Sequence, residues 1–315
     1  MRAVSPAIII TSCTNRKMDT GEVVALARPL QAASVSALAN HWKDKVAAAQ
    51  FRVPAHALYQ GRSFTEAKAA AAKAGAVLYI ASAGHGIVES NEVLPGYNLT
   101  VTPGDSNLLV ETLDRLHSTS ADWWVTLTKC RPQKSLATLM SSIDLPEASV
   151  ILALPSTYLS MILADLSTLN ESQTAQLRII TSELGSTLLP KRLQKQVLPY
   201  DERLEALPAY AGTRNDFPQR ALHHFVGELS GHTLSLRAAK QCVHEAMATL
   251  KKSSPPKREK KSDGELLQLI RCHRLELNNS QSAMLRWLRD DQKISCEQER
   301  FRHLWHQVQA ENPLK

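Results

Sequence analysis

Residues Ala7–Lys17 read AIIITSCTNRK, an aliphatic run that passes directly into small polar residues and then two cations. Uninterrupted aliphatic runs of this length are typical of strands that are covered on both faces. Similar runs recur through the first two-thirds of the chain. We expect strands at Ala7–Ser12, Pro54–Leu58, Ala76–Ala81, Trp123–Leu127, Val150–Leu154 and Leu177–Ser182.

Alanine-rich segments of helix-forming residues lie between these runs, at Ala32–Gln50 and Ser63–Ala74. We expect Ser63 to cap the second helix, with Glu66 three residues later. Helices should also dominate from Asp201 to Leu250. The alternation predicts an α/β fold, a mostly parallel sheet with helices on both faces. In such sheets, ligands bind beyond the carboxyl ends of the strands.

The composition changes sharply after Leu250. Residues 251–264, KKSSPPKREKKSDG, contain paired prolines and six basic residues; such a segment cannot form a core, so we expect a basic linker. Helices are then predicted at Gly264–Leu277, at Ser280–Asp291 with Ser280 as its cap, and from Ser295 with Gln298 completing a capping box. The expected domains are therefore an α/β catalytic domain at 1–250 and a small all-helical module at 265–315.

Positive charge is concentrated in this C-terminal segment. The chain has a formal net charge of +7 from 37 Lys+Arg and 30 Asp+Glu, and residues 251–315 hold 14 of the basic and 9 of the acidic residues, a net of +5. A basic terminal segment is typical of proteins with a polyanionic partner. Three small helices with a basic last one favour a helix-turn-helix-like module that binds double-stranded DNA over a protein-docking module or a solubilising tail. The arginines expected to contact DNA are Arg62, Arg214, Arg220, Arg286, Arg300 and Arg302.

Several classes of protein are disfavoured by what the sequence lacks. The five cysteines are far apart and form no CxxC pair, which favours reduced thiols over a disulfide framework or a zinc or iron–sulfur site. No GxSxG, HExxH, Walker A or GxGxxG motif is present. The apolar stretch at the start is too short for a signal peptide, and no window is long enough to span a membrane. We expect a cytoplasmic protein without metal or cofactor, and no obligate protein partner is evident.

Polar residues follow most of the predicted strands. Cys13, Asn15 and Lys17 follow the first and could hold a phosphate or a base edge. Tyr59 and Gln60 follow the second, where the tyrosine either stacks on an extruded base or caps the core.

The third predicted strand leads into the densest group of such residues. His85 lies between Gly84 and Gly86, and is suited to proton transfer or to stabilising a leaving anion. We expect the small residues around it, Ser82 included, to let backbone amides approach a ligand. The remaining candidates are Tyr97, Asn98, Asp105 (or merely a helix cap), Ser156 (also a potential cap) and Tyr158.

Several of these motifs together resemble a bacterial protein family formerly of unknown function. They are TSCTNRK (11–17), LYQGRSF (58–64), SAGHGIV (82–88) and PGYNLT (95–100), with AGTRNDFPQRALHHF (211–225) and the segment 285–305 similar to parts of the longer members. The family is similar to the uracil-DNA-glycosylase fold, and it has relatives among enzymes of 7-deazaguanine modification. One member acts in anti-phage defence by excising α-glucosylated 5-hydroxymethylcytosine from phage DNA.

The resemblance implies a monofunctional DNA glycosylase that leaves abasic sites in modified phage DNA. His85 and the amides of Gly84–Gly86 would stabilise the departing base, and Asn98 or Asp105 would position water. Many relatives carry Asp at the place of Asn98, but an amide can still orient water. Tyr59, Tyr97 and Tyr158 would form the walls of the base pocket.

Three alternatives remain open at this stage. A lysine nucleophile at Lys17 would make a bifunctional lyase, which is disfavoured because nothing in the sequence marks that lysine as desolvated. A base-exchanging transglycosylase or deoxyribosyltransferase would form a covalent sugar intermediate, with Glu89 as the candidate nucleophile. A non-catalytic DNA-binding regulator would use the α/β domain to sense a nucleotide.

Overall fold

The computed structural model describes residues 8–102, 107–143, 150–252 and 258–311. The chain divides into two compact units, Met1–Ser253 and Ser254–Lys315, and each has its own hydrophobic core. The two units are described separately.

A five-stranded sheet forms the centre of the first unit, in the order β5-β4-β1-β8-β9. Its strands are β1 (Ile8–Ser12), β4 (Val77–Ser82), β5 (Gly86–Glu89), β8 (Val150–Ala153) and β9 (Leu177–Ile180). β1 pairs in parallel with both β4 and β8, β8 pairs in parallel with β9, and β5 is antiparallel to β4. The predicted α/β class with a mostly parallel sheet is therefore confirmed.

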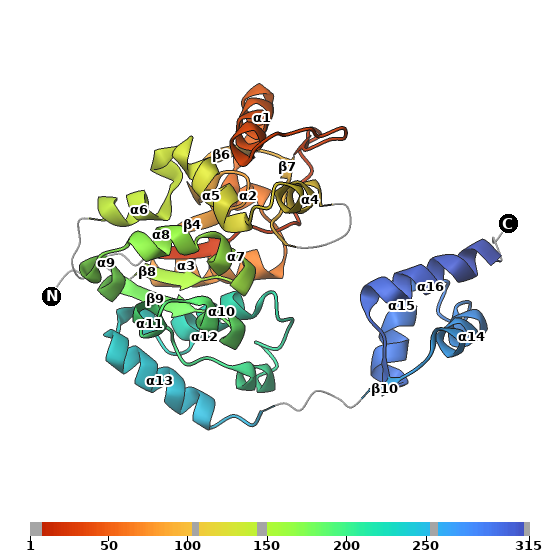
Figure 1. The fold of residues 1–315 in the computed structure, drawn as a ribbon. Coiled ribbons are helices and arrows are strands. Elements are labelled where there is room, and N and C mark those ends of the chain that lie inside the picture. The colour runs from red at the N-terminus through yellow and green to blue at the C-terminus, as the bar shows by residue number, and fades with distance from the viewer. Residues whose placement is uncertain (1–7, 103–106, 144–149, 253–257, 312–315) are drawn as a thin grey trace. The chain divides into compact units, whose positions relative to one another are not determined.

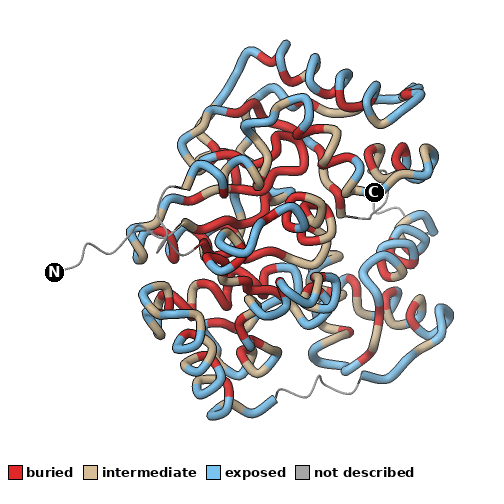
Figure 2. Tube along the Cα trace, turned by 60° about the vertical axis from the view of Figure 1, so that its left-hand side comes forward, coloured by how far each residue is buried: buried red, intermediate tan, exposed pale blue. Residues whose placement is uncertain are grey.

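Helices cover both faces of this sheet. α3 (Arg62–Ala74) and α12 (Phe217–Gly227) pack against each other; α3 contacts β1, and α12 contacts β8 and β9. Figure 1 shows α5 (Ser120–Lys129), α6 (Leu136–Ser142) and α8 (Leu163–Thr168) on the opposite side from α12. Buried residues are concentrated in the layers between them (Figure 2).

The other elements of this unit are shorter or lie further from the sheet. They are β2 (Val24–Ala25), β3 (Arg52–Pro54), β6 (Val93–Pro95), β7 (Tyr97–Asn98), α1 (Val35–Ala48), α2 (Ala55–Leu58), α4 (Leu108–Arg115), α7 (Ser156–Met161), α9 (Glu171–Gln176), α10 (Glu183–Leu188), α11 (Lys191–Gln194), α13 (Leu236–Ala248) and the 3₁₀ helices η1 (Pro132–Lys134), η2 (Glu202–Ala206) and η3 (Gly231–Thr233).

Two predicted strands and one predicted cap are wrong. Residues 55–58 form α2, and the Trp123–Leu127 segment lies inside α5, where Thr119 and Asp122 form a capping box. Trp123 and Trp124 are both fully buried, so their segment has the continuous apolar pattern of a covered strand. α3 begins at Arg62 after Gly61, whose φ is +95°, and it has no side-chain cap.

The second unit contains α14 (Asp263–His273), α15 (Gln281–Arg286), a π-helical turn at Trp287–Asp291 and α16 (Gln298–Glu311). Ser280 caps α15 as predicted. In α16 the apolar side chains at a spacing of three and four residues are buried: Phe301, Leu304, Trp305 and Val308. The unit is not purely helical, because β10 (Glu259–Lys260) pairs in parallel with β11 (Ile294–Ser295). β10 thus falls within the expected linker, and Ser295 lies in a strand instead of capping the last helix.

No helix in the described part of the chain is long and apolar enough to cross a membrane.

Arg220 was expected to contact DNA, but its side chain has no exposed surface. Its Nε donates to Asp216 at 2.8 Å, and its Nη2 donates to Glu205 at 2.8 Å. It also donates to the carbonyl groups of Tyr210 and Thr213. Arg220 therefore ties the segment before α12 to the helix and cannot reach a phosphate.

Replacing Arg220 should destabilise the first unit. Arg220→Ala leaves Asp216 and Glu205 without their counter-ion, and removing one partner of a buried pair costs about 3–5 kcal/mol of unfolding free energy. Urea unfolding followed by circular dichroism measures the loss. Arg214→Ala, at an exposed arginine in the same segment, is the control and should unfold as the wild type does. A loss below about 1 kcal/mol for Arg220→Ala would show that the buried pairs contribute little.

Candidate functional site

A pocket of about 670 Å³ lies at the carboxyl ends of β1, β8 and β9. Parallel pairing brings these three strand ends to one edge of the sheet, so the segments that follow them meet there. They contribute Ser12–Asn15, Pro155–Tyr158 and Ser182–Leu184 to the wall. The start of α12, with Phe217 and Pro218, and the segments around Asp201–Glu205 and Arg214 complete it.

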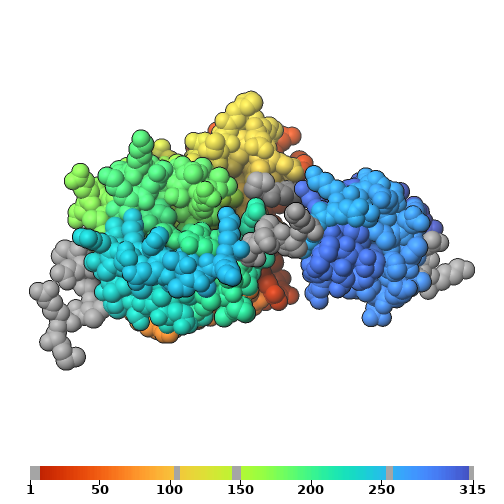
Figure 3. Space-filling model, turned by 90° about the horizontal axis from the view of Figure 1, so that it is seen from below, coloured from red at the N-terminus to blue at the C-terminus, as the bar shows by residue number. Residues whose placement is uncertain are grey.

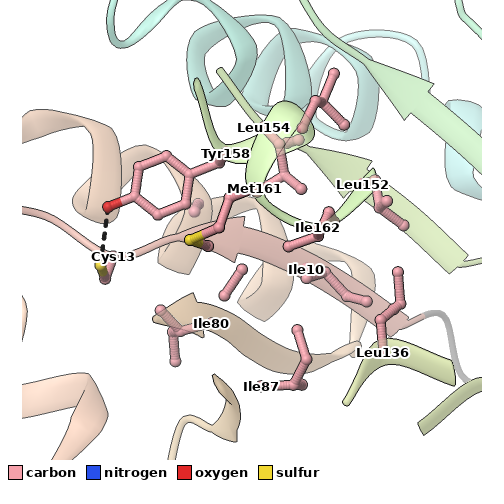
Figure 4. Close-up of a cluster of buried hydrophobic side chains, with 14 of the residues drawn as sticks. Ile10, Cys13, Ile80, Ile87, Leu136, Leu152, Leu154, Tyr158, Met161 and Ile162 are labelled. Atoms are coloured by element: carbon pink, nitrogen blue, oxygen red, sulfur yellow. Dashed lines mark hydrogen bonds between the residues drawn. The ribbon is translucent and has the colours of Figure 1, made fainter. Parts of the chain in front are cut away.

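Four of the predicted substrate-binding residues line this pocket: Cys13, Asn15, Ser156 and Tyr158. The Cys13 amide still continues the sheet by donating to Ala81 O at 3.0 Å. Its Sγ lies 2.9 Å from Tyr158 Oη, and Figure 4 shows the tyrosine ring reaching toward it beside Met161. Burial raises the pKa of Tyr158 well above its ordinary value, so the phenol stays protonated and available as a donor.

A second group of predicted residues forms a buried polar cluster next to Cys13. Tyr97 Oη lies 2.9 Å from Tyr59 Oη and 2.8 Å from Ser82 Oγ. The Lys17 ammonium lies 4.1 Å from the centre of the Tyr97 ring. Lys17 is half-buried, and this burial lowers its pKa. Sequence reasoning gave no sign of this desolvation, which depends on Tyr59 and Tyr97 arriving from distant segments.

His85 lies deeper than expected, with 1% of its surface exposed. Its ring packs edge-on against Tyr97, with centroids 4.8 Å apart, and neither ring nitrogen has a hydrogen-bond partner among the described residues. Burial, assisted by Arg131, Arg52, Lys17 and Lys134, lowers the pKa of His85 to about 3. The imidazole is thus neutral near pH 7 and does not line the pocket.

The small residues around His85 leave room for the close approach of neighbouring side chains and backbone. A Cβ on Gly84 would lie 3.0 Å from Trp42 and 3.1 Å from Tyr97, and one on Gly86 would lie 2.7 Å from Lys134. The amides of Gly84 and His85 both donate to Ser82 Oγ. These contacts show that the small residues Ser82, Gly84 and Gly86 are packed against protein atoms. The sequence predicted that a ligand would approach the backbone amides here, but in the structure the amides of Gly84 and His85 donate to Ser82.

The remaining predicted residues are dispersed. Asn98 and Gln60 are exposed and do not line the pocket, and Glu89 is exposed at the end of β5. Asp105 lies outside the described residues, and the cap of α4 is Asn107. Arg62 donates to the Ala209 and Ala211 carbonyls and to Glu66.

Of the arginines expected to bind DNA, Arg214 alone is exposed on the pocket wall. In the second unit Arg286 is also exposed, whereas Arg300 bonds to Asp263 and Arg302 bonds to Glu299.

Four carboxylates on the pocket wall were not among the predicted site residues: Glu183, Asp201, Glu202 and Glu205. Asp201 accepts from Arg203, which lowers its pKa; Glu202 pairs with Lys252, and Glu205 pairs with Arg220. Glu183 is exposed, and no hydrogen bond or ion pair is found for it within the described residues. The signal in the sequence was its place directly after the run LRIITS.

No group of three or more His, Cys, Asp or Glu side chains in the described segments is arranged to hold a metal ion. The chemistry that the pocket itself can support is acid–base work by carboxylates, with a buried phenol and an exposed guanidinium as donors.

The buried, neutral His85 predicts a pH-dependent stability. Its pKa is about 3 in the folded state and about 6.5 when unfolded, so the unfolded chain binds the extra proton between these values. Stability is therefore fully present above about pH 6.5 and falls as the pH decreases toward 3. Near pH 5 the loss from this residue should be about 2 kcal/mol. Urea unfolding of the wild type and of His85→Gln near pH 7.5 and pH 5 measures it: the variant should lose less stability on acidification. Equal losses would show that His85 is not buried as a neutral group.

Comparison of the chain with protein-family models, with curated proteins and with solved structures finds no match.

Proposed function

We propose that the protein is a DNA glycosylase that hydrolyses the N-glycosidic bond of a modified base bound in the 670 Å³ pocket. The observation that carries this proposal is the combination, in one pocket, of aromatic rings and a carboxylate that has no hydrogen bond or ion pair within the described residues. Tyr158 and Phe217 offer apolar surface to a base, and Glu183 adds a carboxylate with no partner among the described residues.

The size and position of the pocket support a nucleotide-sized ligand. Ligand pockets have volumes of about 300–1,000 Å³, and those of open α/β sheets lie beyond the carboxyl ends of the strands. Enzymes that act on a base in DNA extrude the nucleotide into such a pocket. Asn15, Ser156 and Arg214 supply hydrogen-bonding groups that can read the edge of a base.

Glycosidic hydrolysis passes through a sugar with oxocarbenium character, which carboxylates stabilise. We assign to Glu183 the positioning of water, because Asn98 does not line the pocket and Asp105 lies outside the described residues. Water oxygen bonds to the anomeric carbon as the bond to the base nitrogen breaks. The proton that this water loses passes to Glu183. The base leaves with the electron pair, Arg214 on the pocket wall can stabilise its developing negative charge, and a proton from solvent then neutralises the base. His85 keeps Tyr97 in place beside the site.

The leading substrate is α-glucosylated 5-hydroxymethylcytosine in double-stranded phage DNA, as the family resemblance implies. DNA carrying this base should acquire alkali-sensitive sites and release the intact base, detected by mass spectrometry, whereas unmodified DNA should not. Strand scission before alkali treatment, with chelator present, would contradict a monofunctional glycosylase. Release of ordinary cytosine at the same rate would contradict the specificity, and release only in exchange for added free base would identify a transglycosylase.

Glu183→Gln tests the assigned carboxylate. The variant keeps the size of the side chain but cannot accept a proton from water, so single-turnover base release should slow by about 10²-fold or more. DNA affinity should change little, because the contact acts mainly in the transition state. Glu171→Gln, at an exposed carboxylate of α9 outside the pocket, is the matched control. Similar rates for both variants would remove Glu183 from the mechanism.

We also propose that the second unit supplies general DNA affinity. Its arginine pairs at Arg300 and Arg302 are partly exposed, and such pairs are weak enough to exchange a carboxylate for a phosphate. Deleting residues 254–315 should therefore weaken binding to unmodified duplex and flatten its salt dependence. Fluorescence anisotropy over a range of NaCl concentrations measures both. An unchanged salt slope would exclude this role.

A further inference from the structure

α13 carries a group of basic side chains on its outward face. Ala239, Val243 and Met247 are buried, and Arg237, Lys240 and His244 lie beside this buried stripe at a spacing of three and four residues, with Lys240 half-buried. Together with Pro199, Leu236 and Gln241 these three residues line a hollow of about 490 Å³. α13 is drawn in cyan on the face of the first unit that Figure 3 presents.

The charge in this hollow is not balanced locally. None of the lining residues is acidic. Lys240 donates to the carbonyl of Lys195, and Arg178 of β9 lies close enough to lower the pKa of Lys240, after the larger effect of burial. Arg178 bonds to the carbonyls of Ala175 and Leu177, and its Nε is buried without a partner among the described residues.

The nearest carboxylate on α13 is Glu245, which accepts from Gln241. Like charges packed without a counter-ion raise the free energy of the unliganded protein, so an anion bound here would be stabilised.

This hollow adjoins the pocket at the strand ends through shared lining residues. His244 and Pro199 also line an intermediate hollow of about 410 Å³. That hollow shares Ser182, Glu183, Asp201 and Glu202 with the large pocket. The three hollows are therefore neighbours, with carboxylates on the pocket wall and cations on α13.

We propose that the α13 hollow, through Arg237 and Lys240, binds the DNA backbone beside the nucleotide that enters the pocket. A free phosphate ion would need only the hollow, whereas a DNA strand also accounts for its place beside the pocket. Asp201, Glu202 and Glu205 are paired with cations, so Glu183 is the carboxylate that disfavours a phosphate at the pocket end. The inference rests on the proposed function for the identity of the polyanion.

Paired substitutions in the full-length protein test the proposal. Arg237→Gln/Lys240→Gln removes two charges while keeping long, helix-favouring side chains. Lys43→Gln/Lys129→Gln removes two charges from exposed positions on α1 and α5 and is the matched control. Far-UV circular dichroism and thermal melting verify that both variants fold. Fluorescence anisotropy with an unmodified duplex of about two helical turns (~20 base pairs) then gives Kd from low to high NaCl.

The α13 variant should raise Kd about tenfold at moderate salt, and lower the slope of log Kd against log [NaCl] by about 2, because two phosphate contacts are lost. The control should leave the slope unchanged. Equal effects of the two pairs would overturn the proposal. So would tighter binding of an RNA duplex of the same sequence, or a calorimetric signal for inorganic phosphate that is lost in the α13 variant while DNA binding is kept.

Binding and base release separate the two proposals. If the α13 variant loses DNA affinity but no DNA releases a base with the wild type, the proposed function fails and the binding surface stands. If base release occurs and the α13 variant binds as the control does, the surface fails and the function stands. If both stand, the α13 variant should release base at the wild-type single-turnover rate once DNA is saturating.

Discussion

The parallel pairing of β1 with both of its neighbours is the constraint on which the rest of the first unit depends. β1 lies at the centre of the sheet, and its residues Ile9 and Ile10 are fully buried. Because β1, β8 and β9 run in the same direction, the chain leaves all three at one edge. The backbone groups released there are no longer paired within the sheet, so small polar residues follow each strand. The pocket is a consequence of this arrangement, and its walls come from segments as far apart in the chain as Ser12 and Pro218.

Desolvation beside that edge determines the chemical state of its side chains. Tyr59 and Tyr97 are buried and remain protonated because burial raises their pKa values. The same environment lowers the pKa values of Lys17 and His85. Burial therefore disfavours the charged form of each of these four side chains. Ionised groups are placed on the solvent side, at Glu183 and Arg214. Cys13 belongs to both regions, because its Sγ contacts the buried Tyr158 and it also lines the pocket.

The strands of the parallel sheet were predictable from the sequence, because a covered strand needs a short run made mostly of aliphatic residues. β1, β4, β8 and β9 all have such runs. The prediction of a strand at Trp123–Leu127 was wrong for the same physical reason, because a helix that is buried on most sides also has an uninterrupted run of apolar residues. The position of the pocket followed from the strand direction. Its carboxylates did not, because Asp201, Glu202 and Glu205 arrive from η2 and the segment before it, whose path depends on tertiary packing around Arg220.

His85 shows most clearly what residue type and spacing leave undetermined. Glycines on both sides of a histidine are compatible with an open ligand site and equally with close packing. The structure has close packing, because Trp42 and Tyr97 fill the space beside Gly84 and Lys134 fills the space beside Gly86. A base bound at the strand ends would meet Tyr158 and Phe217, with this layer behind them. The histidine packs edge-on against Tyr97 behind the pocket, and under the proposed function it is a positioning residue that supports the pocket wall.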